Sequence, residues 1–213
     1  AATASLSSPS AFAEGLNRAA GESRLLIASF DDNVSDELAD TQVAGALAGD
    51  DGPTPHVDIT FDDLTGSKMS YYLRYSADVD AIGCSDGVQK LAGAVTVNQA
   101  ISPSDAAKLP AAVTGGGQFG TEPGSQYVLV RIYGPHGGSI DRVRLAGKEL
   151  KDLEVHHING RPMANVDVLL SSRRDVVLNW EGTTGPGQTG TGQLDMTPSV
   201  VPGSDSHAFG SSC

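Results

Sequence analysis

Four side chains suited to contacting a ligand occur close together in the segment 62–74, DDLTGSKMSYYLR. They are Lys68, Tyr71, Tyr72 and Arg74. Tyrosine rings offer apolar faces for stacking on a sugar, and a guanidinium suits an anionic group. The segment therefore predicts a ligand-contacting strand. The alternative is structural, with the two basic residues neutralising nearby aspartates while one tyrosine packs inward.

A second set consists of acidic side chains that could form a loose calcium site. These metal candidates are Asp31, Asp58, Asp62 and Asp63. The stretch 31–36, DDNVSD, begins like a calcium-binding loop, but an EF-hand needs glycine at position six and glutamate at position twelve. Asp36 and Gln42 stand at those positions, so we expect no EF-hand. A solvated acidic surface is the alternative for the whole set.

Catalytic signatures are missing from the sequence. No H-E-x-x-H or G-x-S-x-G motif occurs, and the adjacent His156 and His157 would point to opposite faces of a strand. Gly115, Gly117 and Gly120 match G-x-G-x-x-G, but a dinucleotide site needs a helix after the motif, and here a strand is expected. We therefore predict no catalytic residue and no cofactor for this chain.

The chain has two cysteines, Cys84 and Cys213. They are too far apart for a CxxC metal or thioredoxin motif. In an oxidising compartment they could form a disulfide, which would attach the tail 202–213 to the body of the protein. The alternative is two unrelated thiols.

Charge excludes several classes of partner. The formal net charge is −12, and residues 1–70 hold twelve acidic against three basic side chains. Such a surface repels phosphate backbones and anionic lipid headgroups, so we expect no nucleic-acid binding and no direct membrane insertion. No run of 18 apolar residues occurs that would span a bilayer.

The front of the chain predicts mixed secondary structure. Ser8 and Pro9 form an N-cap and first-turn pair, which predicts a helix over 9–20. A second helix is expected from Asn33 or Ser35 to residue 47. Strands are expected over 24–30, 56–61, 69–75 and 88–97, and a short helix from residue 102.

The back of the chain predicts an all-β fold. Asn159-Gly160 is the strongest hairpin signal, because both residues tolerate the positive φ of a type I′ turn. Trp180 is expected in the core. The strands are expected over 127–133, 140–145, 148–155, 153–158, 164–170, 176–180 and 193–197.

These elements predict an α+β protein in three parts. Residues 1–120 form an α/β subdomain with two to three short helices and a small sheet, and 121–200 form an immunoglobulin-like antiparallel β-sandwich. Residues 201–213 form an extended tail. The glycine-rich segment 114–124 marks the boundary between the first two parts.

Several stretches match a known family in order along nearly the whole chain. They are 11–29, 38–47, 63–73 with its K-M-x-Y-Y core, Cys84, 109–116, 130–138, 160–170 and 196–198. In these the chain resembles the C-terminal half of the bacterial envelope proteins of domain of unknown function 4012. The resemblance implies an actinobacterial-type protein at the cell surface, tethered to the membrane by a segment absent from this sequence.

Three functions follow as hypotheses. The first is an extracytoplasmic structural or interaction module of a membrane-anchored envelope protein, with an envelope protein or cell-wall glycan as partner. The second is a binding module for a cell-wall glycan or its phosphorylated precursor, using Lys68, Tyr71, Tyr72 and Arg74. The third is part of an envelope-polymer transferase or hydrolase whose chemistry lies in the absent N-terminal half.

Overall fold

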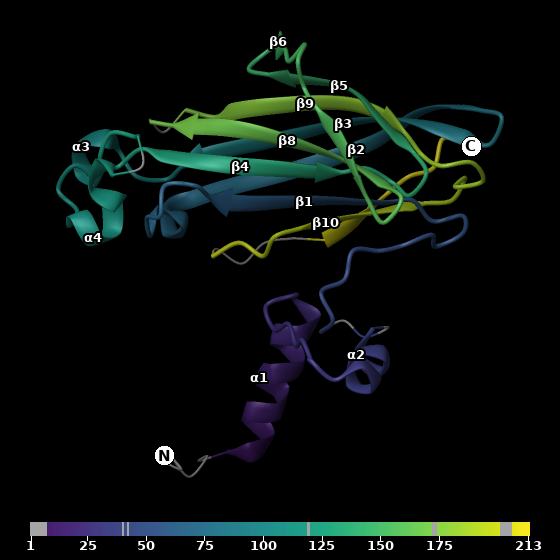
Figure 1. Ribbon diagram of the computed structural model, residues 1–213, viewed down its shortest axis with the longest axis horizontal. Helices are drawn as coiled ribbons and strands as arrows, with labels where there is room; N and C mark the ends of the chain where they lie inside the picture. The colour runs from purple at the N-terminus through teal and green to yellow at the C-terminus, as the bar shows by residue number, and fades with distance from the viewer. Residues whose placement is uncertain (1–7, 40, 42, 119, 172–173, 201–205) are drawn as a thin grey trace. The chain divides into compact units, whose positions relative to one another are not determined.

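The computed structural model describes all residues except 1–7, 40, 42, 119, 172–173 and 201–205. The chain divides into two units, residues 1–47 and residues 48–213 (Figure 1). The protein is α+β with a β-sandwich, as the sequence predicts. The first unit holds the two longest helices, and the second holds every strand that the structure describes.

The first unit consists of helices α1 (Pro9–Gly21) and α2 (Asp32–Leu38). The Ser8 side chain accepts a hydrogen bond from the Ala11 amide, which confirms the predicted N-cap of α1. The predicted strand over 24–30 is wrong, because these residues form no strand. One hydrogen bond, from the Ile27 amide to the Val43 carbonyl, joins this segment to the chain that follows α2.

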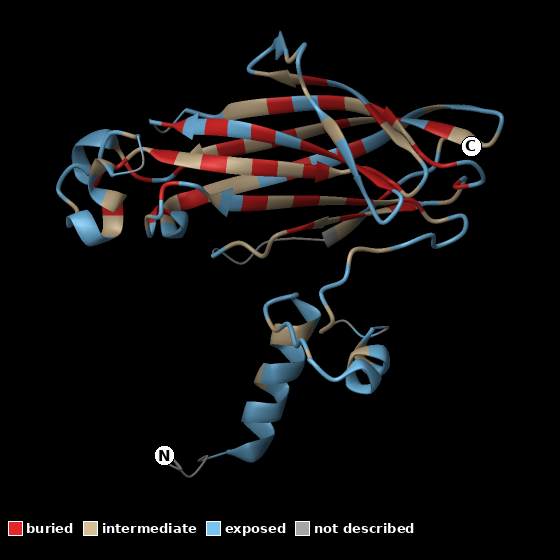
Figure 2. Ribbon diagram, in the orientation of Figure 1, coloured by how far each residue is buried: buried red, intermediate tan, exposed pale blue. Residues whose placement is uncertain are grey.

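The second helix also differs from expectation. Asp31 is its cap, accepting hydrogen bonds from the amides of Asn33 and Val34, and the helix ends at Leu38. No described residue of 8–47 is buried, as Figure 2 shows. This unit therefore has no hydrophobic core within the described residues.

The second unit is a sandwich of two sheets. The first sheet has the strand order β11-β10-β1-β4-β8-β7, and the second has the order β2-β3-β9-β5-β6. The bounds of the first sheet's strands are β1 His56–Asp63, β4 Gln126–Tyr133, β7 Val155–Ile158, β8 Arg161–Leu170, β10 Gly192–Met196 and β11 Ser206–Phe209. Those of the second sheet are β2 Leu73–Ser85, β3 Val88–Gln99, β5 Ser139–Leu145, β6 Lys148–Glu149 and β9 Val176–Thr183. The pairings between neighbours are antiparallel, apart from β1 with β10, which is parallel.

Alternating side chains build the core between the sheets. In β1 the predicted face of Val57, Ile59 and Phe61 is buried, and the same alternation of buried and accessible residues runs along the other long strands (Figure 2). Trp180 is 1% exposed and fills this core, as predicted. Its ring lies over Gly93, where an added Cβ would be 2.1 Å from the indole nitrogen.

The domain boundary expected near residue 120 lies inside the second unit. β1, β2 and β3 all precede that position, yet each belongs to a sheet of the sandwich. The glycine-rich segment 114–124 is therefore a connection between β3 and β4 and does not link two domains. The division lies instead between Leu47 and Ala48.

Short helices lie in the connections between strands at one end of the sandwich. They are η1 (Met69–Tyr72), α3 (Pro103–Ala106), α4 (Ala111–Thr114) and η2 (Gly115–Gly117). The strand predicted over 69–75 begins only at Leu73, since the first four residues form η1. α3 and α4 lie together at this end (Figure 1).

The hairpin predicted at Asn159-Gly160 is confirmed. Both residues have positive φ, 50° and 77°, and the turn joins β7 to β8 with Ile158 opposite Arg161. The tail differs from expectation, because its residues 206–209 form strand β11 and pair with β10. Residues 201–205 of the predicted tail lie outside the described residues.

Candidate binding site at the helical end of the sandwich

The end of the sandwich that carries η1, α3, α4 and η2, here called the helical end, is held by its own small core. Met69 is 0% exposed and packs with Ile101 and Ala106. Backbone contacts add to this, since the Lys68 amide donates to the Val113 carbonyl at 2.9 Å. The buried Gln99 side chain donates to the Gly124 carbonyl at 2.7 Å. The connections at this end are therefore fixed to the sheets at several points.

The predicted ligand residues lie at the helical end but do not form one surface. Tyr71 is 62% exposed and Lys68 is exposed, whereas Tyr72 is half-buried against the small core. The rings of Tyr71 and Tyr72 meet edge to face, with centroids 5.2 Å apart. Tyr72 is thus a packing residue, and Tyr71 and Lys68 remain accessible.

Arg74 has a local structural role. Its Nη1 donates to the carbonyls of Tyr71 and Leu73, at 2.9 and 2.8 Å. The guanidinium therefore secures the junction between η1 and β2. One of its nitrogen atoms is thus used by the backbone of the protein.

A pocket of about 390 Å³ lies at the same end of the sandwich. It is lined by Gly117, Gly120, Thr121, Glu122, Ser125, Tyr127, Leu169 and Ser171. None of the four predicted ligand residues is among them. From the sequence, the glycines are expected in a connector and Tyr127 in a strand. The pattern that marks the pocket residues as neighbours is the pairing of β4 with β8.

The floor of the pocket comes from the outer face of the first sheet. Tyr127 and Leu169 are directly opposite each other in the β4–β8 register. Their neighbours Val128 and Val168 point into the core and are 0% and 1% exposed. Because side chains alternate along a strand, Tyr127 and Leu169 face outward, and Leu169 is 51% exposed.

The aspartates proposed as metal ligands have protein partners instead. Asp62 pairs with Arg131, Asp63 accepts hydrogen bonds from Thr65 and Ser67, and Asp31 caps α2. Among the described residues, no group of three or more His, Cys, Asp or Glu side chains is arranged to hold a metal ion. The structure therefore does not bring this predicted set together.

Asp58 forms a buried ion pair. Its Oδ2 lies 2.6 Å from Nη1 of Arg161, whose side chain is 0% exposed. The remaining Arg161 donors reach the carbonyls of Gly134 and His56, both at 2.8 Å. Burial raises the pKa of the Asp58 carboxyl above its usual 3.8, against the opposing effect of Arg161. The pair joins the ends of β1, β4 and β8 and is a structural feature.

Arginines on the outer face of the other sheet lower the pKa of a second carboxyl group, that of Glu181. Glu181 accepts hydrogen bonds from Arg144 and Arg142, at 2.9 and 3.0 Å. The Arg144 hydrogen bond is the largest cause that lowers the pKa of this carboxyl group. The three residues form a cross-strand ion-pair network, which is an ordinary feature of an exposed sheet face.

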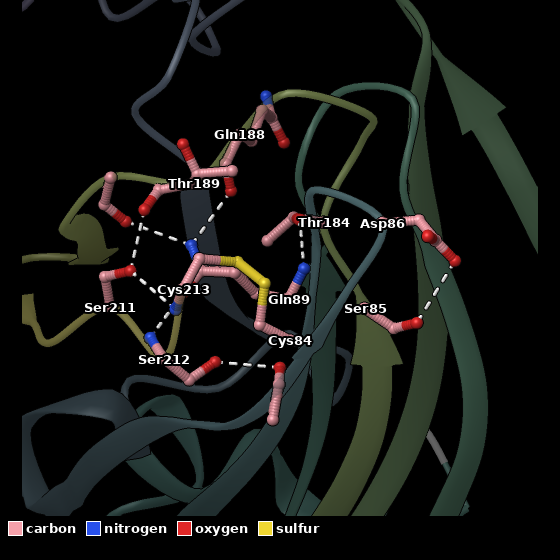
Figure 3. The surroundings of a disulfide bond; sticks show 12 residues. Cys84, Ser85, Asp86, Gln89, Thr184, Gln188, Thr189, Ser211, Ser212 and Cys213 are labelled. Carbon is pink, nitrogen blue, oxygen red and sulfur yellow. Dashed lines mark hydrogen bonds between the residues drawn. A yellow bond between two sulfur atoms is a disulfide. The ribbon is translucent and has the colours of Figure 1, made fainter.

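Cys84 and Cys213 form the predicted disulfide (Figure 3). It joins the last residue of the chain to β2, and the C-terminus lies away from α3 and α4 (Figure 1). Ser212 supports the same attachment, since its hydroxyl donates to the Gly83 carbonyl and its amide donates to Gln89. Both cysteines are exposed, so the bridge faces solvent.

The comparisons with known proteins find distant structural neighbours and no family. No family model matches, and no curated protein matches. Among solved structures, the chain is similar to a putative nutrient binding protein from Legionella pneumophila, with a TM-score of 0.32 and 9% identity over 69% of this chain and 52% of that one. It is also similar to an M1 zinc metallopeptidase from Deinococcus radiodurans, with a TM-score of 0.26 and 10% identity over 67% of this chain and 22% of that one.

At these TM-scores the likeness carries no functional argument, and this chain spans only about a fifth to a half of the two neighbours. In the part of the chain that the structure describes, no helix is both long enough and apolar enough to cross a bilayer.

Proposed function

We propose that this chain is the extracytoplasmic interaction module of a membrane-anchored bacterial envelope protein, with no catalysis of its own. The observation that carries the proposal is the solvent-facing Cys84–Cys213 disulfide. Exposed disulfides persist in oxidising compartments and are reduced in the cytosol. The resemblance described above supports the same compartment, and tethering by a segment outside this sequence belongs to the proposal.

An interaction role fits the distribution of side chains better than catalysis by this chain. Asp58 and Glu181, the two carboxyl groups with a shifted pKa, are each bound by arginines within the scaffold. Neither lines the pocket at the helical end. A transferase or hydrolase reaction needs a cleft in which titratable groups converge on one point. The hypothesis of an envelope-polymer enzyme therefore rests on the N-terminal half that the resemblance implies.

The helical end is the surface we assign to partner contact. It presents Tyr71 and Leu64, which are 62% and 43% exposed, beside the pocket floor. Leu64 is held there by a 2.8 Å hydrogen bond from its amide to the Tyr127 carbonyl. Exposed apolar side chains on a rigid support are typical of contact surfaces.

The compartment is tested in the native cell with the whole protein. Cells are quenched with acid to trap the thiol state, and the denatured protein is then treated with a maleimide–polyethylene glycol reagent with and without prior reduction. We expect Cys84 and Cys213 to react only after reduction. Two reactive thiols without reduction would place the chain in the cytosol and overturn the proposal.

The contact surface is tested by photo-crosslinking in the same cells. A photoreactive phenylalanine analogue is placed at Tyr71, with Ile82 as the matched control because it is 63% exposed but lies beside the disulfide end of β2. We expect adducts with an envelope component from position 71 and none from position 82. Equal yields, or no adduct at either position, would contradict the assignment.

A further inference from the structure

The pocket at the helical end has an apolar floor, whereas another row of the same outer face is polar. Thr60, Arg131 and Asn165 form a row across β1, β4 and β8 farther along the same outer face. At the helical end that row is replaced by Tyr127 and Leu169. A half-exposed tyrosine beside a half-exposed leucine leaves apolar area in water at this point. Such area is covered favourably by the flat apolar face of a ligand.

The walls of the pocket are polar but mostly uncharged. Thr121, Ser125 and Ser171 bring hydroxyl groups, which both donate and accept hydrogen bonds. Gly117 and Gly120 have φ of 77° and 79°, so the backbone there turns in the left-handed region and carries no side chain.

Charge decides between neutral and anionic ligands. Among the described residues that line the pocket there is no Lys, Arg or His, and Glu122 contributes a carboxylate. The whole chain adds a net charge of −12. A phosphorylated or carboxylated ligand would approach against this field, and no described lining residue offers it a cation. A carboxylate accepts hydrogen bonds from hydroxyl groups, so Glu122 favours a polyhydroxylated neutral ligand.

The size and rigidity of the pocket fit one small ring. Small-molecule sites in proteins span roughly 300–1,000 Å³, and the pocket's 390 Å³ lies near the lower limit. Its wall is anchored by the hydrogen bond from Gln99 to Gly124 and by Ser125, whose amide donates to the Glu122 carbonyl at 2.9 Å. These hydrogen bonds hold the wall residues 122–125 in place before a ligand binds, which lowers the cost of binding.

We propose that this pocket binds a single neutral sugar ring, with the ring's C–H face on Tyr127 and Leu169 and its hydroxyl groups on Glu122 and the neighbouring serines. The inference rests on the proposed interaction module and names the chemistry of its ligand. It moves saccharide recognition away from Tyr72 and Arg74, which the scaffold uses. It favours a neutral sugar over the phosphorylated glycan precursor as the ligand of this pocket.

Saturation-transfer NMR on the full chain tests the proposal. The probes are methyl β-glucoside and N-acetylglucosamine, with glucose 6-phosphate as the charged comparison. We expect transfer to the ring C–H protons of the neutral sugars and at least severalfold weaker transfer to the phosphate ester. Tyr127→Ala should weaken binding of the neutral sugars about tenfold, since a lost stacking contact has that order of effect.

Matched variants test whether the sugar binds in this pocket. Tyr71→Ala removes a tyrosine that is 62% exposed at the same end but does not line the pocket, and it should leave binding unchanged. Glu122→Gln tests the acceptor role and should weaken binding, and Leu169→Lys tests the floor if Tyr127→Ala proves unstable. Equal loss in Tyr71→Ala, or no loss in the three pocket variants, would refute the site.

Two further outcomes would overturn the inference without touching the proposed module. One is stronger binding of glucose 6-phosphate than of the neutral sugars. The other is no transfer to any probe at millimolar concentration while position 71 still crosslinks to an envelope component. Loss of that crosslink together with free thiols in the native cell would instead remove the interaction module itself.

Discussion

Removing the Cys84–Cys213 disulfide should destabilise the sandwich mainly through its unfolded state. The two cysteines are 129 residues apart in sequence. Closing a loop of that length in the unfolded chain corresponds to about 5 kcal/mol at 25 °C in the chain-entropy model. The folded state should change little, because Phe209 of β11 is 5% exposed and its ring lies against Gly192, where a Cβ would be 2.0 Å away.

The double variant Cys84→Ser/Cys213→Ser is the clean perturbation, since it leaves no free thiol. For a unit of this size a loss of 1 kcal/mol lowers the melting temperature by roughly 2–4 °C, so we expect a fall of about 10–20 °C. Trp180, the one tryptophan, is 1% exposed and reports unfolding by fluorescence. Urea titration then gives the free energy of unfolding and its dependence on urea.

Two results would refute this reasoning. A loss below about 1 kcal/mol would show that the bridge does not constrain the unfolded chain. The second result is a large loss of stability with β11 already detached in the native state, while the dependence of the free energy of unfolding on urea is unchanged. That result would locate the effect in the folded protein. The wild type reduced with a dithiol serves as the control, and it should match the double variant.

Three other substitutions test the scaffold. Arg161→Met leaves the Asp58 carboxylate without its cation, and Asp58→Asn leaves the 0% exposed Arg161 guanidinium without its anion. Each should cost about 3–5 kcal/mol in a urea titration. Because the folded-state pKa of Asp58 is raised, the folded protein holds this proton at higher pH than the unfolded chain does. Wild type should therefore gain stability relative to Asp58→Asn as the pH falls from neutral toward 3.8, and the opposite trend would contradict the cause given for the shift. Gly93→Ala places a methyl group against the Trp180 ring and should cost about 1–3 kcal/mol with a shifted tryptophan emission; an unchanged melting temperature would contradict the packing described.

Strands with one buried face could be predicted from the sequence because their pattern is local. Val57, Ile59 and Phe61 alternate with polar residues, and that alternation alone distinguishes the core side of β1. The turn at Asn159-Gly160 was equally readable, since few residue pairs tolerate two positive φ values. The disulfide could be proposed because the chain has no other cysteine.

The domain boundary was misplaced for a physical reason. Glycine-rich sequence has the composition of a linker, but this connection is attached to the sheets by residues distant in sequence, as Gln99 is bonded to Gly124.

The strand predicted over 24–30 was wrong for the opposite reason. Its apolar run LLIASF reads as a buried strand, yet no described residue of the first unit is buried, and Phe30 is fully exposed. An apolar run forms a strand only where a neighbouring strand pairs with it.

The pocket was missed because its defining pair is not local. Tyr127 and Leu169 become neighbours through the β4–β8 register, which is set by eight consecutive pairings from Gln126–Leu170 to Tyr133–Met163. A slip of one residue would turn Tyr127 into the core and bring Val128 to the surface. The inward residues Val128, Val130, Val166 and Val168 forbid that slip, because each is at most 2% exposed. The hydrophobic core of the sandwich therefore determines which aromatic ring the pocket presents, and the choice of ligand depends on packing that the sugar never touches.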